Sequence, residues 1–202
     1  MNKMTKSLII ATNNPGKARE FGEMFQDYDI EIKTLADFPE IPEIKENGIT
    51  FEENATKKVT TVVEATGLPA IADDSGLMVD ALHGDPGVFS ARYAGDHNDA
   101  ANNAKLLANL GGVPEEKRTA TFHTTLVALK PNGQKLVVNG ELNGRILIAP
   151  RGDNGFGYDP LFWSDKYQKS LAQLSDAEKN SISHRGAALR NLMPKFDEWW
   201  GA

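Results

Sequence analysis

The segment 68–76 constrains the fold of this chain more than any other part of the sequence. The short apolar run 68–72 is followed directly by two acids, Asp73 and Asp74, and then by Gly76. A short apolar run between turn signals is typical of a buried strand. Open α/β sheets bind their ligands at the carboxyl ends of such strands. The sequence therefore predicts a buried strand that ends at the two acids and opens onto a polar crevice.

The two acids are expected to have different roles. Successive side chains of a strand point to opposite faces, so only one of Asp73 and Asp74 can readily face a given ligand. We assign the chemical role to Asp74. The alternative is that 73–76 is an ordinary polar turn, since Asp, Ser and Gly are common turn formers.

The spacing of apolar residues on both sides of this segment predicts a mixed α/β fold. Strands are expected at 7–11, 119–129, 135–148 and 160–163, and the turn at 131–133 makes the middle pair an antiparallel hairpin. Helices are expected over 18–25, 51–66 and 99–110, the last with Asp99 as its N-cap, and then from a capping box at 175–178 and from 183 onward. With no internal repeat and no low-complexity linker, residues 1–202 are predicted to form a single domain with two lobes.

Composition narrows the functions that this fold could have. The chain has 202 residues, 40% of them hydrophobic and 25% charged, which is ordinary for a globular protein. Because it has no cysteine, any metal would be a hard ion with oxygen ligands, and Mg²⁺ fits that description. The net charge of −6 disfavours binding to a nucleic acid polymer. No apolar run approaches the roughly 18 residues of a membrane span, and the short apolar run after residues 1–6 predicts no leader and a cytoplasmic location.

Two regions are candidates for binding phosphate and metal. Residues 12–17 lie between a strand and a helix start, where backbone amides attract phosphate, and Lys17 adds a full charge. The spacing is not that of a Walker A loop, and the alternative is a plain capping loop. Asn54 and Lys58 lie one helical turn apart at the border of an apolar stripe, which suggests that they face a cleft. Glu46 could be an oxygen ligand for a metal or a solvated loop residue.

A third region, further along the chain, is a candidate for binding a planar base. The loop 155–159 places Phe156 between two glycines, so a ring could be presented by closely approaching backbone. The alternative is that Phe156 and Tyr158 both anchor the loop in the core. His184 and Arg185, with Lys179 nearby in sequence, offer donors for carbonyl or phosphate oxygens.

Six blocks of the sequence, in this order, resemble the motifs of the inosine triphosphate pyrophosphatase family. They are Ala11-Thr-Asn-Asn-Pro-Gly-Lys17, Thr50-Phe-Glu-Glu-Asn-Ala55, Ala72-Asp-Asp-Ser-Gly-Leu77, Pro86-Gly-Val-Phe-Ser-Ala-Arg-Tyr-Ala-Gly95, Gly155-Phe-Gly-Tyr-Asp-Pro160 and Ser183-His-Arg185. The resemblance implies a mixed sheet in a two-lobed fold with the active site in the cleft between the lobes, a homodimer and a Mg²⁺ requirement. It also implies hydrolysis of ITP, dITP and XTP at the α-β phosphoanhydride, giving the monophosphate and pyrophosphate and so cleansing the nucleotide pool.

The resemblance also implies roles for individual residues. Asp74 is similar to the family's general base and metal-linked acid, and Glu46 to a metal ligand. The residues similar to the family's substrate contacts are Thr12, Asn13, Asn14, Pro15, Gly16, Lys17, Lys58, Ser75, Phe156, Gly157, Tyr158, Asp159, Lys179, His184 and Arg185. Two departures, Asn47 where many members have threonine and His123-Thr124 in a strand, leave these roles unchanged.

Two other functions remain open at this stage. One is a related house-cleaning pyrophosphatase for modified pyrimidine or methylated nucleotides. The other is a sensor that binds a nucleoside triphosphate without cleaving it. The pair Asp73-Asp74 favours an enzyme over a sensor, because paired carboxylates can hold a metal and activate water.

Overall fold

The computed structural model describes residues 6–201 of the chain. The expected absence of a leader depends partly on residues 1–5, which lie outside this range. The described chain divides into two compact units. The first comprises 6–74, Thr125–Val138 and 191–201, and the second comprises Ser75–Thr124 and Asn139–Arg190.

The predicted mixed α/β class is confirmed. Seven strands form one sheet in the order β2-β1-β3-β4-β5-β6-β7, with parallel pairs around β1 and antiparallel pairs around β6. The strands are β1 (Lys6–Ile10), β2 (Ile30–Thr34), β3 (Ala70–Val79), β4 (Thr119–Leu129), β5 (Lys135–Ile146), β6 (Phe162–Ser164) and β7 (Lys169–Ser170). The helices are α1 (Pro15–Met24), α2 (Phe51–Thr66), α3 (Asp99–Asn109), α4 (Asp176–Ile182) and α5 (His184–Trp200).

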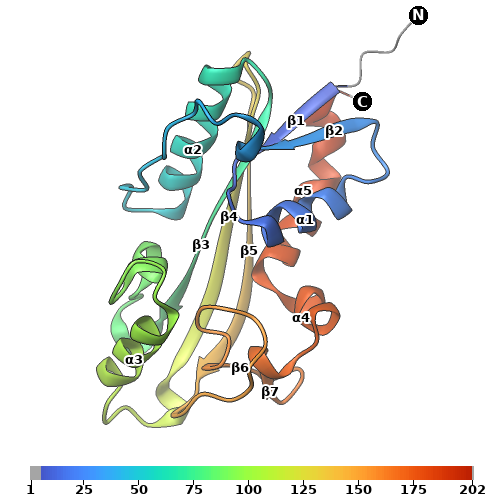
Figure 1. Cartoon of the computed structure of the whole chain (residues 1–202). Coiled ribbons are helices and arrows are strands. Elements are labelled where there is room, and N and C mark those ends of the chain that lie inside the picture. Colours follow the sequence, from blue (N-terminus) through green and yellow to red (C-terminus); the bar gives the residue numbers. More distant parts are fainter. Residues whose placement is uncertain (1–5, 202) are drawn as a thin grey trace, which may run out of the picture. The chain divides into compact units, whose positions relative to one another are not determined.

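The first unit is built around the parallel strands β1 and β3. Figure 1 shows α2 on one side of these strands and α1 on the other. The apolar stripe of α2 packs on the sheet residues of its own side, with Val59 and Val62 fully buried beside Ile9 and Ala72. On the side of α1, the rings of Phe25 and Phe196 lie 4.7 Å apart. The two faces of these strands are thus covered by different helices, which decides what each acid of β3 can meet.

The prediction that the strand ends at the two acids is wrong. β3 continues through Asp73 and Asp74 to Val79, and both Leu77 and Val79 are fully buried. The alternative of a polar turn at 73–76 is wrong for the same reason. Burial of the alternating apolar residues beyond the acids keeps the chain extended, although Asp, Ser and Gly have low strand propensity. The acids therefore lie inside a long strand and not at its end.

The second unit contains the predicted helix α3 and the capping box of α4. The N-cap of α3 is Asn98, whose side chain accepts a hydrogen bond from the backbone N–H of Ala101, and not Asp99 as predicted. Asp99 is the first helical residue, and its carboxylate is used elsewhere. The box at Ser175 and Glu178 is confirmed. In residues 6–201, no helix is both long and apolar enough to cross a membrane.

Candidate active site

The two acids of β3 have different partners, as the alternation of a strand predicts. The carboxylate of Asp73 accepts a hydrogen bond from Lys17 Nζ, on α1, at 2.7 Å. The carboxylate of Asp74 accepts one from Asn54 Nδ2, on α2, at 2.9 Å. Both acids are buried, with exposed fractions of 3% and 6%. Asp73 therefore forms an ion pair, whereas Asp74 is bonded to a neutral amide.

Burial disfavours the charged form of Asp74. Burial raises the pKa of this carboxyl from 3.8 to about 6, against the opposing effects of the Lys58 charge and the Asn54 hydrogen bond. The negative charges of Glu46 and Asp73 push the pKa in the same direction as burial. A carboxylate with a pKa near 6 is still ionised at neutral pH and is well matched to accept a proton there. Its charge would also be stabilised by a bound cation.

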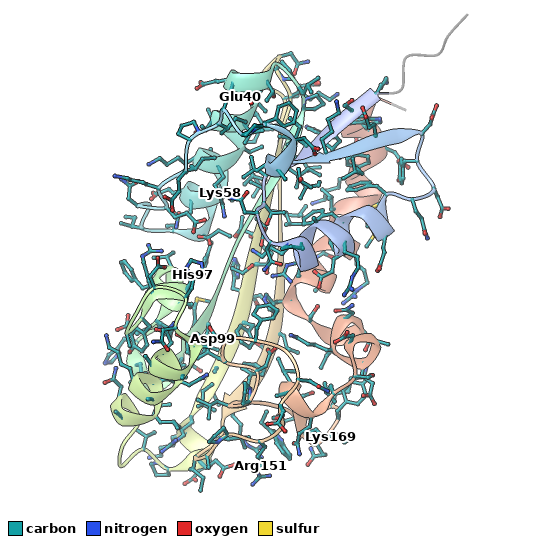
Figure 2. All side chains as sticks on the ribbon, in the orientation of Figure 1. Glu40, Lys58, His97, Asp99, Arg151 and Lys169 are labelled. Carbon is teal, nitrogen blue, oxygen red and sulfur yellow. The ribbon has the colours of Figure 1, made fainter. Side chains whose placement is uncertain are left out.

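Lys58 is a second cation paired with an acid near Asp74, and Figure 2 shows its place on α2. Its Nζ lies 2.8 Å from Glu46 Oε1. Burial opposes the charge of Lys58, but the charges of Asp73, Glu46 and Asp74 outweigh that effect and raise the pKa of the lysine. Lys58 therefore stays protonated. The structure brings together the predicted metal-binding residues Glu46 and Asp74 and the predicted phosphate-binding residue Lys58.

Asn54 holds this cluster in place, although its role could not be assigned from the sequence. The residue is completely buried on α2. Its Oδ1 accepts the backbone N–H of Gly48 at 2.7 Å, while its Nδ2 donates to Asp74. One side chain thus fastens the loop that carries Glu46 and also orients the catalytic candidate Asp74. The feature of the sequence that pointed to Asn54 was its position one helical turn before Lys58.

The loop 12–17 is in part a helix cap. The Asn14 side chain accepts the backbone N–H groups of Gly16 and Lys17, at 2.9 and 3.3 Å, and the hydroxyl of Thr12 accepts the N–H of Asn14 at 3.0 Å. Pro15 occupies the start of α1, where its missing N–H costs nothing. The amides at this helix start are therefore already bonded to Asn14, and the charge of Lys17 is the main attraction that the loop offers a phosphate. The neighbouring Asn13 is exposed.

No group of three or more His, Asp or Glu side chains within residues 6–201 is arranged to hold a metal ion. A complete protein cage for a metal is thus missing from the described chain. Mg²⁺ typically binds through one or two carboxylates and completes its shell with water and substrate phosphates. Asp74, whose pKa is raised by burial, and Glu46, which is paired with Lys58, provide the two carboxylates of that smaller requirement.

In the second unit, the loop 155–159 presents one aromatic ring and buries the other. Phe156 is 58% exposed, whereas Tyr158 is 5% exposed and lies in the core, where its hydroxyl donates to Ser90 O at 2.7 Å. The interpretation as a core anchor thus holds for Tyr158 and not for Phe156. Tyr158 anchors the loop, and Phe156 is the ring available to a ligand.

Polar side chains fix the loop around this ring. The carboxylate of Asp159 accepts the backbone N–H of Phe156 at 3.0 Å and pairs with Lys179 Nζ at 2.5 Å. The same ammonium group lies 4.6 Å from the centre of the Phe156 ring. Gly155 has a φ of +80°, and a Cβ there would collide with the Asp159 carboxylate. Lys179, Asp159 and Phe156 thus form one cluster.

The remaining predicted residues of this unit lie near the start of α5 and in β3. The ring of His184 stacks on Phe122, with centroids 4.9 Å apart and planes inclined by 12°. Arg185 is 7% exposed. The hydroxyl of Ser75 lies 2.8 Å from that of Thr124. His184 and Ser75 are thus each in contact with a residue of their own unit, and Arg185 is buried.

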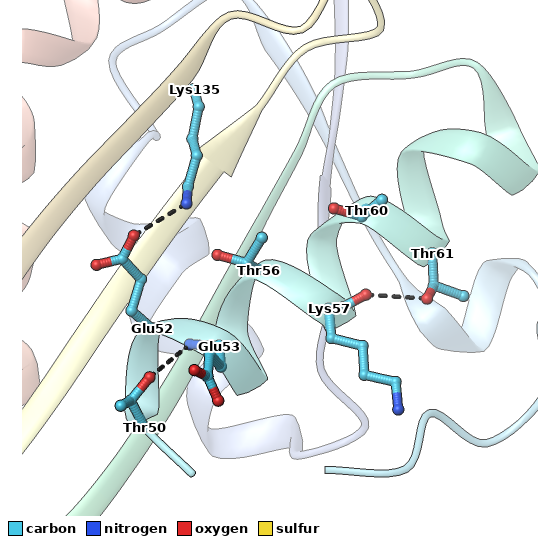
Figure 3. A pocket seen from close by; sticks show the side chains of 8 residues that line it. All are labelled: Thr50, Glu52, Glu53, Thr56, Lys57, Thr60, Thr61 and Lys135. Carbon is cyan, nitrogen blue, oxygen red and sulfur yellow. Dashed lines mark hydrogen bonds and ion pairs between the residues drawn. The ribbon is translucent and has the colours of Figure 1, made fainter. Parts of the chain in front are cut away.

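A hollow of about 620 Å³ lies elsewhere on the first unit (Figure 3). It is lined by Thr50, Glu52, Glu53, Thr56, Lys57, Thr60, Thr61 and Lys135. Glu52 and Lys135 close one part of it with an ion pair of 3.0 Å. None of the predicted site residues lines this hollow, so we do not include it in the candidate site.

The chemistry of the two clusters defines a class of protein. Ammonium groups beside buried carboxylates suit a polyphosphate and a hard cation. An exposed ring on a glycine loop suits a planar base. A mixed α/β chain with both features is a nucleotide-processing enzyme of the pyrophosphohydrolase type.

Comparisons with known proteins narrow this class to one family. Residues 8–195 match the model of the Ham1 family, and the chain therefore belongs to that family. It is 85% identical over 199 residues to the dITP/XTP pyrophosphatase of Lactiplantibacillus plantarum, with 98% of each chain covered. It is 50% identical over 198 residues to that of Bacillus cereus, covering 96% of this chain and 97% of the relative. The family resemblance expected from the six blocks is confirmed.

Solved structures support the same assignment. A HAM1 protein from Coxiella burnetii matches with a TM-score of 0.90 and 41% identity, covering 96% of this chain and 99% of that chain. The Staphylococcus aureus Ham1 protein matches with a TM-score of 0.89 and 40% identity, with the same coverage. The predicted fold is thus that of solved members of the family.

Proposed function

We propose that this protein hydrolyses the non-standard purine nucleoside triphosphates ITP, dITP and XTP to the monophosphate and pyrophosphate. The observation that carries the proposal is the buried Asp74 beside Lys58 and Glu46, in a chain 85% identical to a relative named dITP/XTP pyrophosphatase. In this proposal the acid cluster of the first unit binds the triphosphate, and the loop 155–159 of the second unit binds the base.

Mg²⁺ is the proposed cofactor, held by Asp74 and Glu46. Three carboxylates, those of Glu46, Asp73 and Asp74, face two ammonium groups, those of Lys17 and Lys58, so the cluster has an excess of one negative charge. A bound Mg²⁺ would neutralise phosphate charge and polarise the phosphoryl oxygens. The donor set fits this ion because both ligands are carboxylate oxygens.

The protein residues then have the following roles. Asp74 accepts the proton of a water molecule whose oxygen attacks the α phosphorus. The bond between the α phosphorus and the bridging oxygen breaks, and pyrophosphate leaves with the electron pair. Lys58 and Lys17 stabilise the negative charge that develops on the phosphates. Asn54 keeps the Asp74 carboxylate oriented through its hydrogen bond.

Base recognition is assigned to the second unit. The ring of Phe156 stacks on the purine, and donors at His184 and Arg185 bind the 6-keto oxygen. An adenine presents an amino group at that position, which leaves those donors unsatisfied, and an unpaired buried donor is costly. Ser75, Gly157 and Lys179 complete the proposed substrate contacts.

Release of pyrophosphate from ITP, XTP, dATP and GTP, each with Mg²⁺ and with EDTA, tests the proposed function. We expect ITP and XTP to be cleaved about 100-fold faster than dATP, and only with the metal, while GTP measures selection at the 2-position of the purine. Cleavage of modified pyrimidine or methylated nucleotides in preference to ITP would favour the related house-cleaning activity. Tight binding of ITP without any cleavage in Mg²⁺ would instead show a sensor.

We also propose a cytoplasmic location and a homodimeric state. The location is where the nucleoside triphosphate pool is found, and the dimer follows from the family resemblance. Sedimentation equilibrium of the full chain should give about twice the mass of 22.1 kDa. A monomeric mass across the micromolar range would contradict the proposed dimer.

A further inference from the structure

The exposed ring of Phe156 lies on backbone that glycine makes intrinsically mobile. Gly155 and Gly157 on either side of it have φ values of +80° and +60°. Glycine loses more conformational freedom on ordering than any other residue. A ring on such a loop would bind a base weakly unless other groups fixed the loop beforehand, because the cost of ordering would be subtracted from the binding free energy.

Two side chains of α3 bind both polar backbone atoms of Gly157. Asp99 Oδ2 accepts the Gly157 N–H at 2.7 Å, and Asn103 Nδ2 donates to the Gly157 carbonyl at 2.8 Å. Asp99 and Asn103 are one helical turn apart, so they lie on the same face of α3. Figure 2 shows Asp99 at the start of this helix. Both the N–H and the C=O of Gly157, the residue directly after Phe156, are thus held by side chains of α3.

The backbone of Phe156, directly before Gly157, is restrained by a separate hydrogen bond. The Asp159 carboxylate holds the N–H of Phe156, and Lys179 pairs with that carboxylate. Three side-chain hydrogen bonds therefore restrain the backbone of two consecutive residues, while the ring between them is left 58% exposed. A loop restrained in this way around an exposed apolar ring has its binding surface ordered before the ligand arrives.

The side-chain contacts of Asn103 also indicate that this residue stabilises the loop more than the helix that carries it. Its Oδ1 is buried and has no hydrogen-bond partner among residues 6–201. A buried unpaired oxygen is unfavourable, and asparagine is a weaker helix former than alanine. The bond to Gly157 is the interaction that Asn103 does make. Replacing this residue by alanine should therefore change the loop more than the global stability.

We propose that Asp99 and Asn103 are positioning residues that clamp Gly157 and thereby hold the Phe156 ring ready to stack on the purine base. The inference rests on the proposed function, because it takes the base as the partner of that ring. It adds two residues of α3 to the determinants of substrate affinity, through their hydrogen bonds to Gly157.

A double-mutant cycle with Phe156→Ala tests the inference. Loss of one base-stacking contact should raise KM for XTP about 10-fold or more in Phe156→Ala. Asn103→Ala should raise KM about 3- to 10-fold and leave kcat within about 2-fold, because the ring is displaced without being removed. In the Phe156→Ala background, Asn103→Ala should add less than about 2-fold, since residues that act through one contact are not additive. Equal effects of Asn103→Ala in both backgrounds would overturn the inference.

Two further variants separate the clamp from general effects on α3. Asp99→Asn retains an acceptor for the Gly157 N–H and should keep KM near that of the unchanged protein, whereas Asp99→Ala should raise it. Asn109→Ala removes a hydrogen bond of the same helix, to the Tyr93 hydroxyl, and should leave KM unchanged. An increase in KM for Asn109→Ala equal to that for Asn103→Ala would show a helix effect and contradict the clamp.

Amide hydrogen exchange of Gly157 in the ligand-free protein gives a readout besides activity. Asp99→Ala should accelerate this exchange about 10-fold, because it removes the acceptor of the amide. Unchanged exchange would refute the clamp whatever the kinetics show. An unchanged KM for Phe156→Ala would instead refute the stacking in the proposed function, and the inference about the base would fall with it. A raised KM for Phe156→Ala together with an unchanged KM for Asn103→Ala would refute the positioning role alone.

Discussion

Replacing Asp74 by asparagine should reduce the rate of ITP and XTP hydrolysis by about 1,000-fold or more while leaving the fold intact. The variant loses both the proposed proton acceptor and one of two proposed metal ligands. Its amide is the same size as the carboxylate, and its oxygen can still accept the hydrogen bond of Asn54 Nδ2. The measurement is the single-turnover rate at saturating Mg²⁺, with circular dichroism of both proteins as the check on folding.

The dependence on Mg²⁺ separates the two roles of Asp74. If Asp74 were only a ligand, high Mg²⁺ would restore much of the rate of the asparagine variant. If it also accepts the proton, the rate should stay low at every metal concentration. The matched control is Asp80→Asn, since Asp80 is an acid outside the cluster whose partner is the hydroxyl of Thr119. A rate for Asp74→Asn within about 10-fold of the unchanged protein would remove Asp74 from the mechanism.

The parts of the fold that the sequence predicted well are those fixed by neighbouring residues. The helix over 51–66 was predicted with its observed bounds, because its start and stop signals are local. Thr50 caps it with a side-chain hydrogen bond to Glu53 N, and Gly67 ends it in the left-handed conformation. The capping box of α4 is equally local. The family blocks also located the candidate site residues, but their roles stay predictions until they are tested.

The features that sequence analysis missed depend on contacts between distant residues. The strand β3 was expected to end at the acids because Asp, Ser and Gly favour turns locally, and burial of Leu77 and Val79 overrode that preference. Asp99 was expected to cap α3, but its carboxylate binds Gly157, 58 residues further along the chain. The bond from Asn103 to the same glycine spans 54 residues. No periodicity or motif spacing encodes such pairings, so they become visible only in the folded chain.

The variant Asp74→Asn should also make the metal-free protein more stable at pH 8, by roughly 3 kcal/mol. The pKa of Asp74 is 3.8 ordinarily and about 6 in the folded, metal-free protein, chiefly because of burial. At about 1.4 kcal/mol per pKa unit, this difference gives the stated value to within an order of magnitude. The charged carboxylate therefore destabilises the folded state, and a neutral amide of the same shape does not.

The sign of the pH dependence follows from proton binding. An acid whose pKa is raised by folding holds its proton more tightly in the folded state. Between about pH 4 and pH 6 the folded protein thus binds more protons than the unfolded chain, and its free energy of unfolding falls as the pH rises. The asparagine variant lacks this component. Urea unfolding in EDTA should therefore give the variant and the unchanged protein similar free energies of unfolding near pH 4. At pH 8 the free energy of unfolding of the variant should be the larger one.

The adjacent acid provides the control for this prediction. Asp73 is paired with Lys17 at 2.7 Å, so Asp73→Asn removes a favourable interaction and should lower the stability by about 1 to 3 kcal/mol. The substitutions Asp73→Asn and Asp74→Asn should thus change the free energy of unfolding in opposite directions. Equal destabilisation by both variants would show that the surroundings of Asp74 stabilise its charged carboxylate. That result would contradict the prediction that the charged carboxylate destabilises the folded state. If the gain in the free energy of unfolding of Asp74→Asn disappears in Mg²⁺, the ion stabilises the charged Asp74 of the unchanged protein. The destabilising charge of Asp74 would then be the one that binds the ion of the proposed reaction, so that stability is lost in favour of activity.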